Sequence, residues 1–308
     1  MSIAWIFPGQ GTQYVGMGRS LLSVAPEAQA TLDEADEALG FKLSALLDEG
    51  PVETLTLTEN NQPAILTVSV AWARALLSRG AQPPAGVAGH SLGELSALVV
   101  AGVLAFDDAV RVVRARGAAM QRAVPSGEGA MAAVAGVNED RLLAICAAQP
   151  GVCELAAMNT PGQLVIAGAT AAVKGAVSAV EAEGGRGTLL NVSAPFHCSM
   201  LAPAAEALAE VLTKVTLKPP TVPVLHNVDA APCADPAEIR VRLVAQVTQP
   251  VLWERCLRGL ITRGADRFVE VGPGRALAPM VKKTDRAMDC VSVDRAGALQ
   301  TILSWEVR

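Results

Sequence analysis

Residues 86–98 read Gly-Val-Ala-Gly-His-Ser-Leu-Gly-Glu-Leu-Ser-Ala-Leu. The centre of this stretch, from Gly89 to Gly93, is a G-x-S-x-G pentapeptide between a short apolar run and a good helix-forming segment. A sharp strand-to-helix turn would hold Ser91 in a strained backbone conformation, which small neighbours tolerate. Its hydroxyl would stand at a helix N-terminus, where free N–H groups can bind an oxyanion. The pattern predicts a nucleophilic serine, and an ordinary glycine-rich turn is the alternative.

The composition is that of a large aliphatic chain. Its 308 residues are 51% hydrophobic and only 3% aromatic, enough to bury one large core or two smaller ones. The net charge of −5 argues against nucleic acid or an anionic membrane as the main partner. The six cysteines form no C-x-x-C pair, so we expect a reducing compartment and no metal or disulfide. Without a basic leader or a bilayer-length apolar stretch, the sequence predicts a soluble cytoplasmic protein.

Strands and helices alternate along the chain in two patterns. Over residues 125–194 the predicted order is β-α-β-β-α-β, which indicates a small ferredoxin-like domain inserted into a larger one. Residues 1–124 and 195–308 alternate between short apolar strands and amphipathic helices, which favours a mostly parallel sheet covered on both faces. The predicted fold class is therefore α/β, with a large α/β-hydrolase-like domain and a small inserted domain.

Residues 107–124 predict an amphipathic helix with one charge on its apolar side. On a helical wheel Arg116 shares a face with Ala and Val residues, whereas Arg111, Arg114 and Arg122 lie opposite. A buried guanidinium is costly unless an anion pairs with it. Arg116 therefore either pairs with a protein carboxylate, or snorkels to solvent, or holds a substrate carboxylate through two parallel hydrogen bonds.

A nucleophilic serine needs a base, and the chain has only three histidines. His90 adjoins the serine and should point away from it, and His226 ends a strand. His197 follows a turn at the junction where the chain re-enters the large domain, so we favour it as the base. No histidine follows His226, which disagrees with the usual Ser, Asp/Glu, His order of hydrolases. A backbone carbonyl could orient the imidazole instead.

Eight short motifs together carry a family resemblance. In chain order they are Phe7-Pro-Gly-Gln-Gly-Thr-Gln, Gly89-His-Ser-Leu-Gly-Glu, Arg116-Gly, Asn159-Thr-Pro-Gly-Gln, Pro195-Phe-His197, Asn227-Val, Gln249-Pro-Val and Glu270-Val-Gly-Pro-Gly. The chain resembles malonyl-CoA:acyl carrier protein transacylases and the acyltransferase domains of polyketide synthases over nearly its whole length. Phe196 resembles the residue of malonyl-preferring domains rather than methylmalonyl-preferring ones.

The resemblance implies a role for each matching residue. These are Ser91 as nucleophile, His197 as base, Gln249 as the residue whose carbonyl orients His197, the N–H groups of Gln10 and Leu92 as the oxyanion hole, Arg116 as the malonyl carboxylate ligand, and Asn159 and Phe196 as further residues near the substrate. Coenzyme A would leave in the first half-reaction. The phosphopantetheine thiol of an acyl carrier protein would then take the malonyl group by ping-pong kinetics.

The resemblance also sets the expected partners and the alternatives. It implies no bound cofactor, a monomer, and an acidic carrier protein that a local basic patch would attract. Candidates for that patch are Arg275, Lys282, Lys283 and Arg286. A polyketide synthase or a malonate decarboxylase could be the client instead of fatty acid synthesis. A serine hydrolase or thioesterase, or a catalytically silent binding module, are the other classes of function left open.

Overall fold

Two β-sheets organise the structure, a computed structural model that describes residues 2–294 and 297–305. The larger sheet has the strand order β7-β2-β1-β8-β9, and all of its strand pairs are parallel. Its strands are β1 (Ile3–Phe7), β2 (Gly86–Gly89), β7 (Val224–Leu225), β8 (Arg267–Glu270) and β9 (Asp289–Ser292). Every residue of β1 is buried, as expected for the middle strand of a parallel sheet that is covered on both faces.

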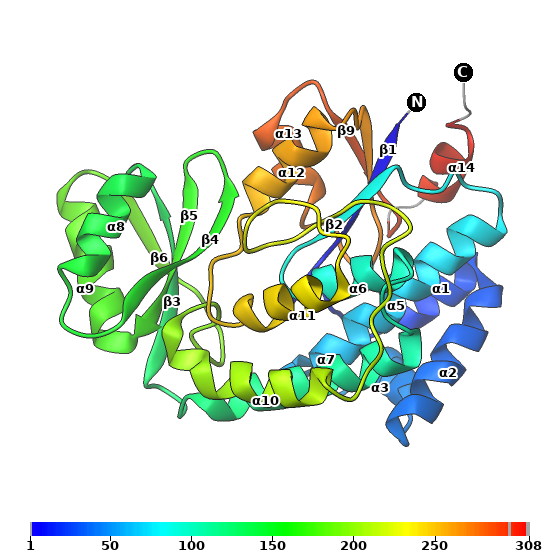
Figure 1. Ribbon diagram of the computed structural model, residues 1–308, viewed down its shortest axis with the longest axis horizontal. Coiled ribbons are helices and arrows are strands. Elements are labelled where there is room, and N and C mark those ends of the chain that lie inside the picture. Colours follow the sequence, from blue (N-terminus) through cyan, green and yellow to red (C-terminus); the bar gives the residue numbers. More distant parts are fainter. Residues whose placement is uncertain (1, 295–296, 306–308) are drawn as a thin grey trace.

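Helices lie on both sides of this sheet (Figure 1). They are α1 (Met17–Val24), α2 (Gln29–Leu39), α3 (Leu43–Glu49), α4 (Val52–Thr56), α5 (Thr58–Ser78), α6 (Gly93–Val100), α7 (Phe106–Ala123), α10 (Ala202–Leu212), α11 (Pro236–Ala245), α12 (Trp253–Thr262), α13 (Ala278–Thr284) and α14 (Ala298–Leu303). Helix α6 packs against β1 and β2, and α5 packs along α7. The predicted helix over 107–124 is α7, with Asp107 and Asp108 in its first turn, where acidic side chains suit the helix dipole.

The smaller sheet is antiparallel, with the order β4-β5-β3-β6. Its elements are β3 (Gly129–Ala135), α8 (Glu139–Ala147), β4 (Cys153–Thr160), β5 (Gln163–Ala169), α9 (Thr170–Ala182) and β6 (Arg186–Leu189). This confirms the predicted order β-α-β-β-α-β. Figure 1 shows α8 and α9 together on the outer side of the sheet, away from the larger one. Asn138 caps α8 by accepting a hydrogen bond from the Arg141 N–H, as its residue type favours.

One edge of the smaller sheet is joined to the rest of the molecule. The N–H of Met158 in β4 donates to the carbonyl of Val251, and the N–H of Val251 donates to the carbonyl of Ala156. The loop before α12 therefore extends this edge by one bridge, and β4 is held in a defined position beside the larger sheet. No helix in the described ranges combines the length and the hydropathy that a membrane span requires.

Candidate active site

The predicted strand–turn–helix around the serine is present. Strand β2 ends at Gly89, Ser91 has a left-handed φ of 52°, and α6 begins at Gly93. Both glycines are sterically required, because a Cβ on Gly89 would lie 1.9 Å from the Gly93 carbonyl carbon. A Cβ on Gly93 would lie 2.1 Å from the carbonyl oxygen of Phe7. The G-x-S-x-G pattern is thus a consequence of close backbone packing, and it places Ser91 at the N-terminus of α6.

Asn227, just after β7, holds this turn in its strained shape. Its Oδ1 accepts from the N–H of Ser91 at 2.7 Å, and its Nδ2 donates to the carbonyl of Gly89 at 2.7 Å. Both groups of the side-chain amide are therefore used on the turn. A non-glycine residue at positive φ costs roughly 1–3 kcal/mol, and two buried hydrogen bonds are of the size needed to offset it.

His197 lies beside the serine as predicted. Its Nε2 is 2.7 Å from Ser91 Oγ, and its Nδ1 is 2.8 Å from the backbone carbonyl oxygen of Gln246. A carbonyl only accepts, so Nδ1 carries the proton and Nε2 is free to accept the serine proton. The expected orienting residue, Gln249, is replaced in this role by Gln246, one helical turn earlier. The Gln249 backbone also raises the pKa of His197, but less than the Gln246 carbonyl does.

The imidazole of His197 is held in its neutral form. The pKa of His197 is lowered to about 3, mainly by burial and next by the nearby Arg116 cation, and the hydrogen bond to the Gln246 carbonyl opposes both effects. The other two histidines have different partners. His90 Nε2 donates to Asn159 Oδ1 at 2.8 Å, and His226 Nδ1 donates to Glu94 Oε1 at 2.7 Å. Only His197 therefore combines a free acceptor nitrogen with the serine hydroxyl.

Arg116 is buried in the apolar interior, with 2% of its surface exposed. Its Nη1 donates to Gln62 Oε1 at 2.8 Å, and its Nη2 donates to Gln246 Oε1 at 2.9 Å and to Ser91 Oγ at 3.3 Å. Burial lowers the pKa of Arg116 to about 10, so the guanidinium remains charged at neutral pH. Within residues 2–294 and 297–305 no carboxylate pairs with Arg116. The two terminal nitrogens of the guanidinium thus donate to neutral oxygens, Nη2 reaches the serine, and Nε is buried without a hydrogen-bond partner.

The loop after β1 closes over the serine turn. A Cβ on Gly9 would lie 2.5 Å from the carbonyl oxygen of His90, so only glycine allows the two backbones to approach this closely. Gln10, the next residue in this loop, and Leu92, the residue after the serine, line the same cavity as Ser91. In the described part of the chain, neither backbone N–H donates a hydrogen bond. Two such N–H groups beside a nucleophile can bind a developing oxyanion.

These residues line one cavity of about 270 Å³ between the two sheets. Its lining includes Gln10, Gln62, His90, Ser91, Leu92, Arg116, Asn159, Phe196 and His197, with apolar walls from Met120, Met131, Ala157, Val165, Leu190 and Val192. Every predicted site residue except Gln249 thus lines this cavity, and the Gln249 backbone lies close to His197. Among the described residues, no cluster of His, Cys, Asp and Glu could hold a metal ion.

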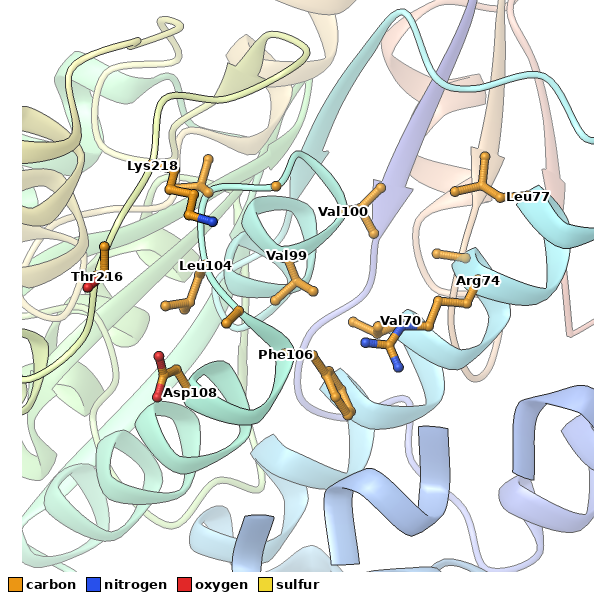
Figure 2. Close-up of a pocket in the computed structure, with 14 residues that line it drawn as sticks. Val70, Arg74, Leu77, Val99, Val100, Leu104, Phe106, Asp108, Thr216 and Lys218 are labelled. Atoms are coloured by element: carbon orange, nitrogen blue, oxygen red, sulfur yellow. The ribbon is translucent and has the colours of Figure 1, made fainter. Parts of the chain in front are cut away.

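A larger hollow of about 670 Å³ lies between the C-terminal end of α6 and the N-terminal end of α7 (Figure 2). Its wall is mostly aliphatic and includes Val70, Val99, Leu104 and the ring of Phe106. Lys218 and Arg74 stand on opposite sides of it. The lining contains no histidine, serine or cysteine, so this hollow has no counterpart of the Ser91–His197 pair. The Ser91–His197 pair lies in the smaller cavity, at the N-terminal end of α6.

Comparison with known proteins agrees with this geometry. A family model described as "Acyl transferase domain" matches residues 4–301. The chain is 44% identical over 295 residues to the malonyl CoA-acyl carrier protein transacylase of Bacillus subtilis (strain 168), covering 94% of this chain and 93% of that protein. This chain belongs to the malonyl CoA-acyl carrier protein transacylase family.

Solved structures of related transacylases have the same fold. The acyl-carrier-protein S-malonyltransferase from Burkholderia pseudomallei 1710b matches with a TM-score of 0.95 and 42% identity, covering 99% of this chain and 100% of that one. A malonyl-transacylase in complex with its type II PKS acyl-carrier protein matches with a TM-score of 0.96 and 39% identity, again covering 99% and 100%. The mixed α/β fold, with a mostly parallel sheet and a small antiparallel one, is thus that of this transacylase family.

Sequence reasoning missed three residues of this transacylase site. Gln62 and Gln246 supply the oxygens that hold Arg116, and Glu94 lies behind them. Gln62 follows Asn61 at the start of a long apolar segment, which is a weak signal for a buried polar residue. Gln246 follows a helix with no local motif. Glu94 directly follows the serine motif, and the available signal was a single charged residue in the mostly apolar helix-forming segment 93–100.

Proposed function

We propose that this chain transfers the malonyl group of malonyl-CoA to the phosphopantetheine thiol of an acyl carrier protein through a malonyl ester on Ser91. The observation that carries the proposal is the buried Arg116 guanidinium, held by neutral oxygens 3.3 Å from the serine hydroxyl. A thioester whose acyl group ends in a carboxylate can pair with this cation while its carbonyl carbon lies at the serine. The names of the curated relatives support the same substrate and acceptor.

In the first half-reaction Ser91 Oγ attacks the thioester carbonyl while its proton moves to His197 Nε2. The N–H groups of Gln10 and Leu92 stabilise the oxyanion, and the carbon–sulfur bond then breaks. The imidazolium returns the proton to the coenzyme A thiolate. In the second half-reaction His197 takes the proton of the carrier thiol, and the sulfur attacks the malonyl ester. The ester bond to Ser91 then breaks, and the imidazolium returns the proton to the Ser91 oxygen.

The remaining expectations belong to this proposal. Residues 125–194 form a ferredoxin-like domain on an α/β-hydrolase-like body, and the enzyme works as a cytoplasmic monomer with no bound cofactor. Asn159 and Phe196 shape the acyl pocket, which both residues line. The carrier protein docks on the exposed cations of α13 and its flanks. Those cations are Arg275, Lys282, Lys283 and Arg286, of which Lys282 already bonds Asp289.

Intact-mass analysis tests the proposal. Malonyl-CoA should add one malonyl group to the wild-type chain, and adding a holo acyl carrier protein should remove it and malonylate the carrier. Ser91→Ala should remain unmodified under the same conditions. Release of free malonate at a rate independent of the carrier protein would identify a hydrolase instead, and labelling of Ser91→Ala would refute the assigned nucleophile.

A second client is supported by one observation. The related transacylase complexed with its type II PKS acyl-carrier protein shares the fold over 99% of this chain. The same enzyme chemistry could therefore serve a polyketide synthase. Comparing kcat/KM for carrier proteins of fatty acid and polyketide synthesis decides between the two clients, because a preferred client should show the higher value.

A further inference from the structure

Two charged side chains are buried behind Ser91, and one amide lies between them. Arg116 and Glu94 are 2% and 1% exposed, and Gln246 is completely buried. We propose that Glu94 is the counter-charge of Arg116, and that the Gln246 side chain holds the two charges apart so that the guanidinium stays open to a substrate carboxylate. This inference rests on the proposed function, and it makes Glu94 and Gln246 positioning residues for malonyl specificity.

The orientation of the Gln246 amide follows from its neighbours. Its Oε1 accepts from Arg116 Nη2 at 2.9 Å, and its Nε2 donates to Glu94 Oε2 at 2.7 Å. A guanidinium only donates hydrogen bonds and a carboxylate only accepts them. In the reversed orientation, Nε2 would face the Arg116 N–H groups and Oε1 would face the Glu94 carboxylate, and neither pair could form a hydrogen bond. The polarised amide therefore links the cation to the anion through two charge-assisted hydrogen bonds.

Glu94 accepts hydrogen bonds on both carboxyl oxygens, and no Arg or Lys pairs with it in the part of the chain that the structure describes. Besides Gln246, its donors are His226 Nδ1 at 2.7 Å and the N–H of Asn227 at 2.9 Å. Attraction by Glu94 is the one influence that raises the pKa of Arg116, against the larger lowering caused by burial. Glu94 thus acts on Arg116 through space and through Gln246, without direct contact.

The spacer matters because a direct ion pair would occupy the guanidinium. A carboxylate in contact with Arg116 would fill the two-nitrogen edge that a substrate carboxylate needs, and binding would require its displacement. With neutral amide oxygens on Nη1 and Nη2, the cation keeps most of its electrostatic attraction for an incoming anion. The arrangement therefore selects acyl groups that end in a carboxylate over those, such as acetyl, that do not.

A charge swap tests this arrangement without changing the net charge. In Glu94→Gln/Gln246→Glu the carboxylate moves from the far side of the spacer into contact with Arg116. We expect acyl-enzyme formation from malonyl-CoA, measured as kcat/KM by quenched intact mass, to fall at least about 30-fold relative to that from acetyl-CoA. The acetyl rate is the internal control for the Ser91–His197 pair. An unchanged malonyl-to-acetyl ratio in the folded double variant would overturn the inference.

Two single variants keep the test decisive if the double variant does not fold. Glu94→Gln removes the distant anion that competes for Arg116, so KM for malonyl-CoA should fall or stay within about twofold while the thermal stability drops. If Glu94 only supported the fold of the site, KM for malonyl-CoA should instead rise in Glu94→Gln. A rise of more than about tenfold would overturn the inference. Glu270→Gln is the matched control, because Glu270 is also completely buried but bonds Leu277, Ala278 and Ser292 instead.

Failure of this inference is distinguishable from failure of the proposed function. If wild-type protein forms no malonyl adduct at Ser91, the transfer reaction itself is refuted. If wild type forms the adduct and the charge swap keeps the wild-type preference, only the roles assigned to Glu94 and Gln246 are refuted. Glu270→Gln should retain the wild-type malonyl-to-acetyl ratio, and a loss there equal to that of the swap would mean that any buried carboxylate has this effect.

Discussion

Replacing Arg116 with methionine should turn a malonyl-selective site into one that barely distinguishes malonyl from acetyl. Methionine keeps an unbranched, flexible stem inside α7 and removes the charge. The substitution leaves the oxygens of Gln62 and Gln246 without their donor, and it removes the contact of 3.3 Å with Ser91 Oγ. The geometry of Ser91 and His197 depends on Asn227 and on the Gln246 backbone, so the nucleophile and its base should remain in place.

The size of the effect follows from what each substrate loses. Malonyl-CoA loses a buried, hydrogen-bonded charge pair, which is worth about 2–5 kcal/mol, or roughly 30-fold to several thousand-fold in kcat/KM. Acetyl-CoA has no carboxylate and loses only the long hydrogen bond of 3.3 Å from the guanidinium to the serine hydroxyl, worth about 0.5–1.5 kcal/mol, or at most roughly tenfold. At the centre of both ranges, the malonyl-to-acetyl preference should fall on the order of 10²-fold.

The assay is acyl-enzyme formation with each thioester, followed by rapid quenching and intact mass. Arg111→Met is the matched control, because Arg111 lies in the same helix but is exposed and bonds Asp107 and Asp108. That control should keep the wild-type preference. Equal losses with malonyl-CoA and acetyl-CoA in Arg116→Met would refute a carboxylate-binding role and leave Arg116 as a structural residue of the serine site.

Two further predictions concern the turn and the base. Asn227→Ala removes both hydrogen bonds that hold Ser91 at positive φ, so kcat should fall by about 10²-fold with malonyl and acetyl alike; a change confined to KM would contradict this role. Buried neutral His197 has a folded pKa far below its unfolded value, so the unfolded chain binds more protons below about pH 6.5 and stability is lost as the pH falls. Asn is chosen to replace His197 because it tolerates the φ of 63° at this position. In urea unfolding, the free energy of unfolding should differ between pH 8 and pH 5 by about 2 kcal/mol less in His197→Asn than in wild type. An unchanged difference would argue against a neutral buried imidazole.

The parts of the site that the sequence predicted are those with local physical causes. The turn around Ser91 was predictable because the close approach of Gly89 and Gly93 admits no Cβ, which leaves a visible five-residue pattern. Arg116 was predictable because helical periodicity alone places it among apolar side chains, and α7 buries that face. The β-α-β-β-α-β order was predictable for the same reason, since each of its elements has its own hydrophobic pattern.

The parts that sequence reasoning missed depend on tertiary contacts. Every residue has a backbone carbonyl, so nothing in a side chain marks Gln246 rather than Gln249 as the acceptor for His197 Nδ1. The two carbonyls lie within one turn after α11, and only the packing of that turn against His197 decides between them. Gln62 and Gln246 are far apart in the chain, and they share a role only because α5 and the end of α11 both reach Arg116.

The same cation links substrate recognition to the strength of the base. In the empty site Arg116 lowers the pKa of His197, which makes the imidazole a weak proton acceptor. A malonyl carboxylate that pairs with the guanidinium offsets this positive charge, so the pKa of His197 rises when the correct acyl group is bound. An acetyl group leaves the charge of Arg116 uncompensated and the base weak. Selectivity should therefore appear in kcat as well as in KM, because the substrate carboxylate contributes to proton transfer at the serine in addition to binding.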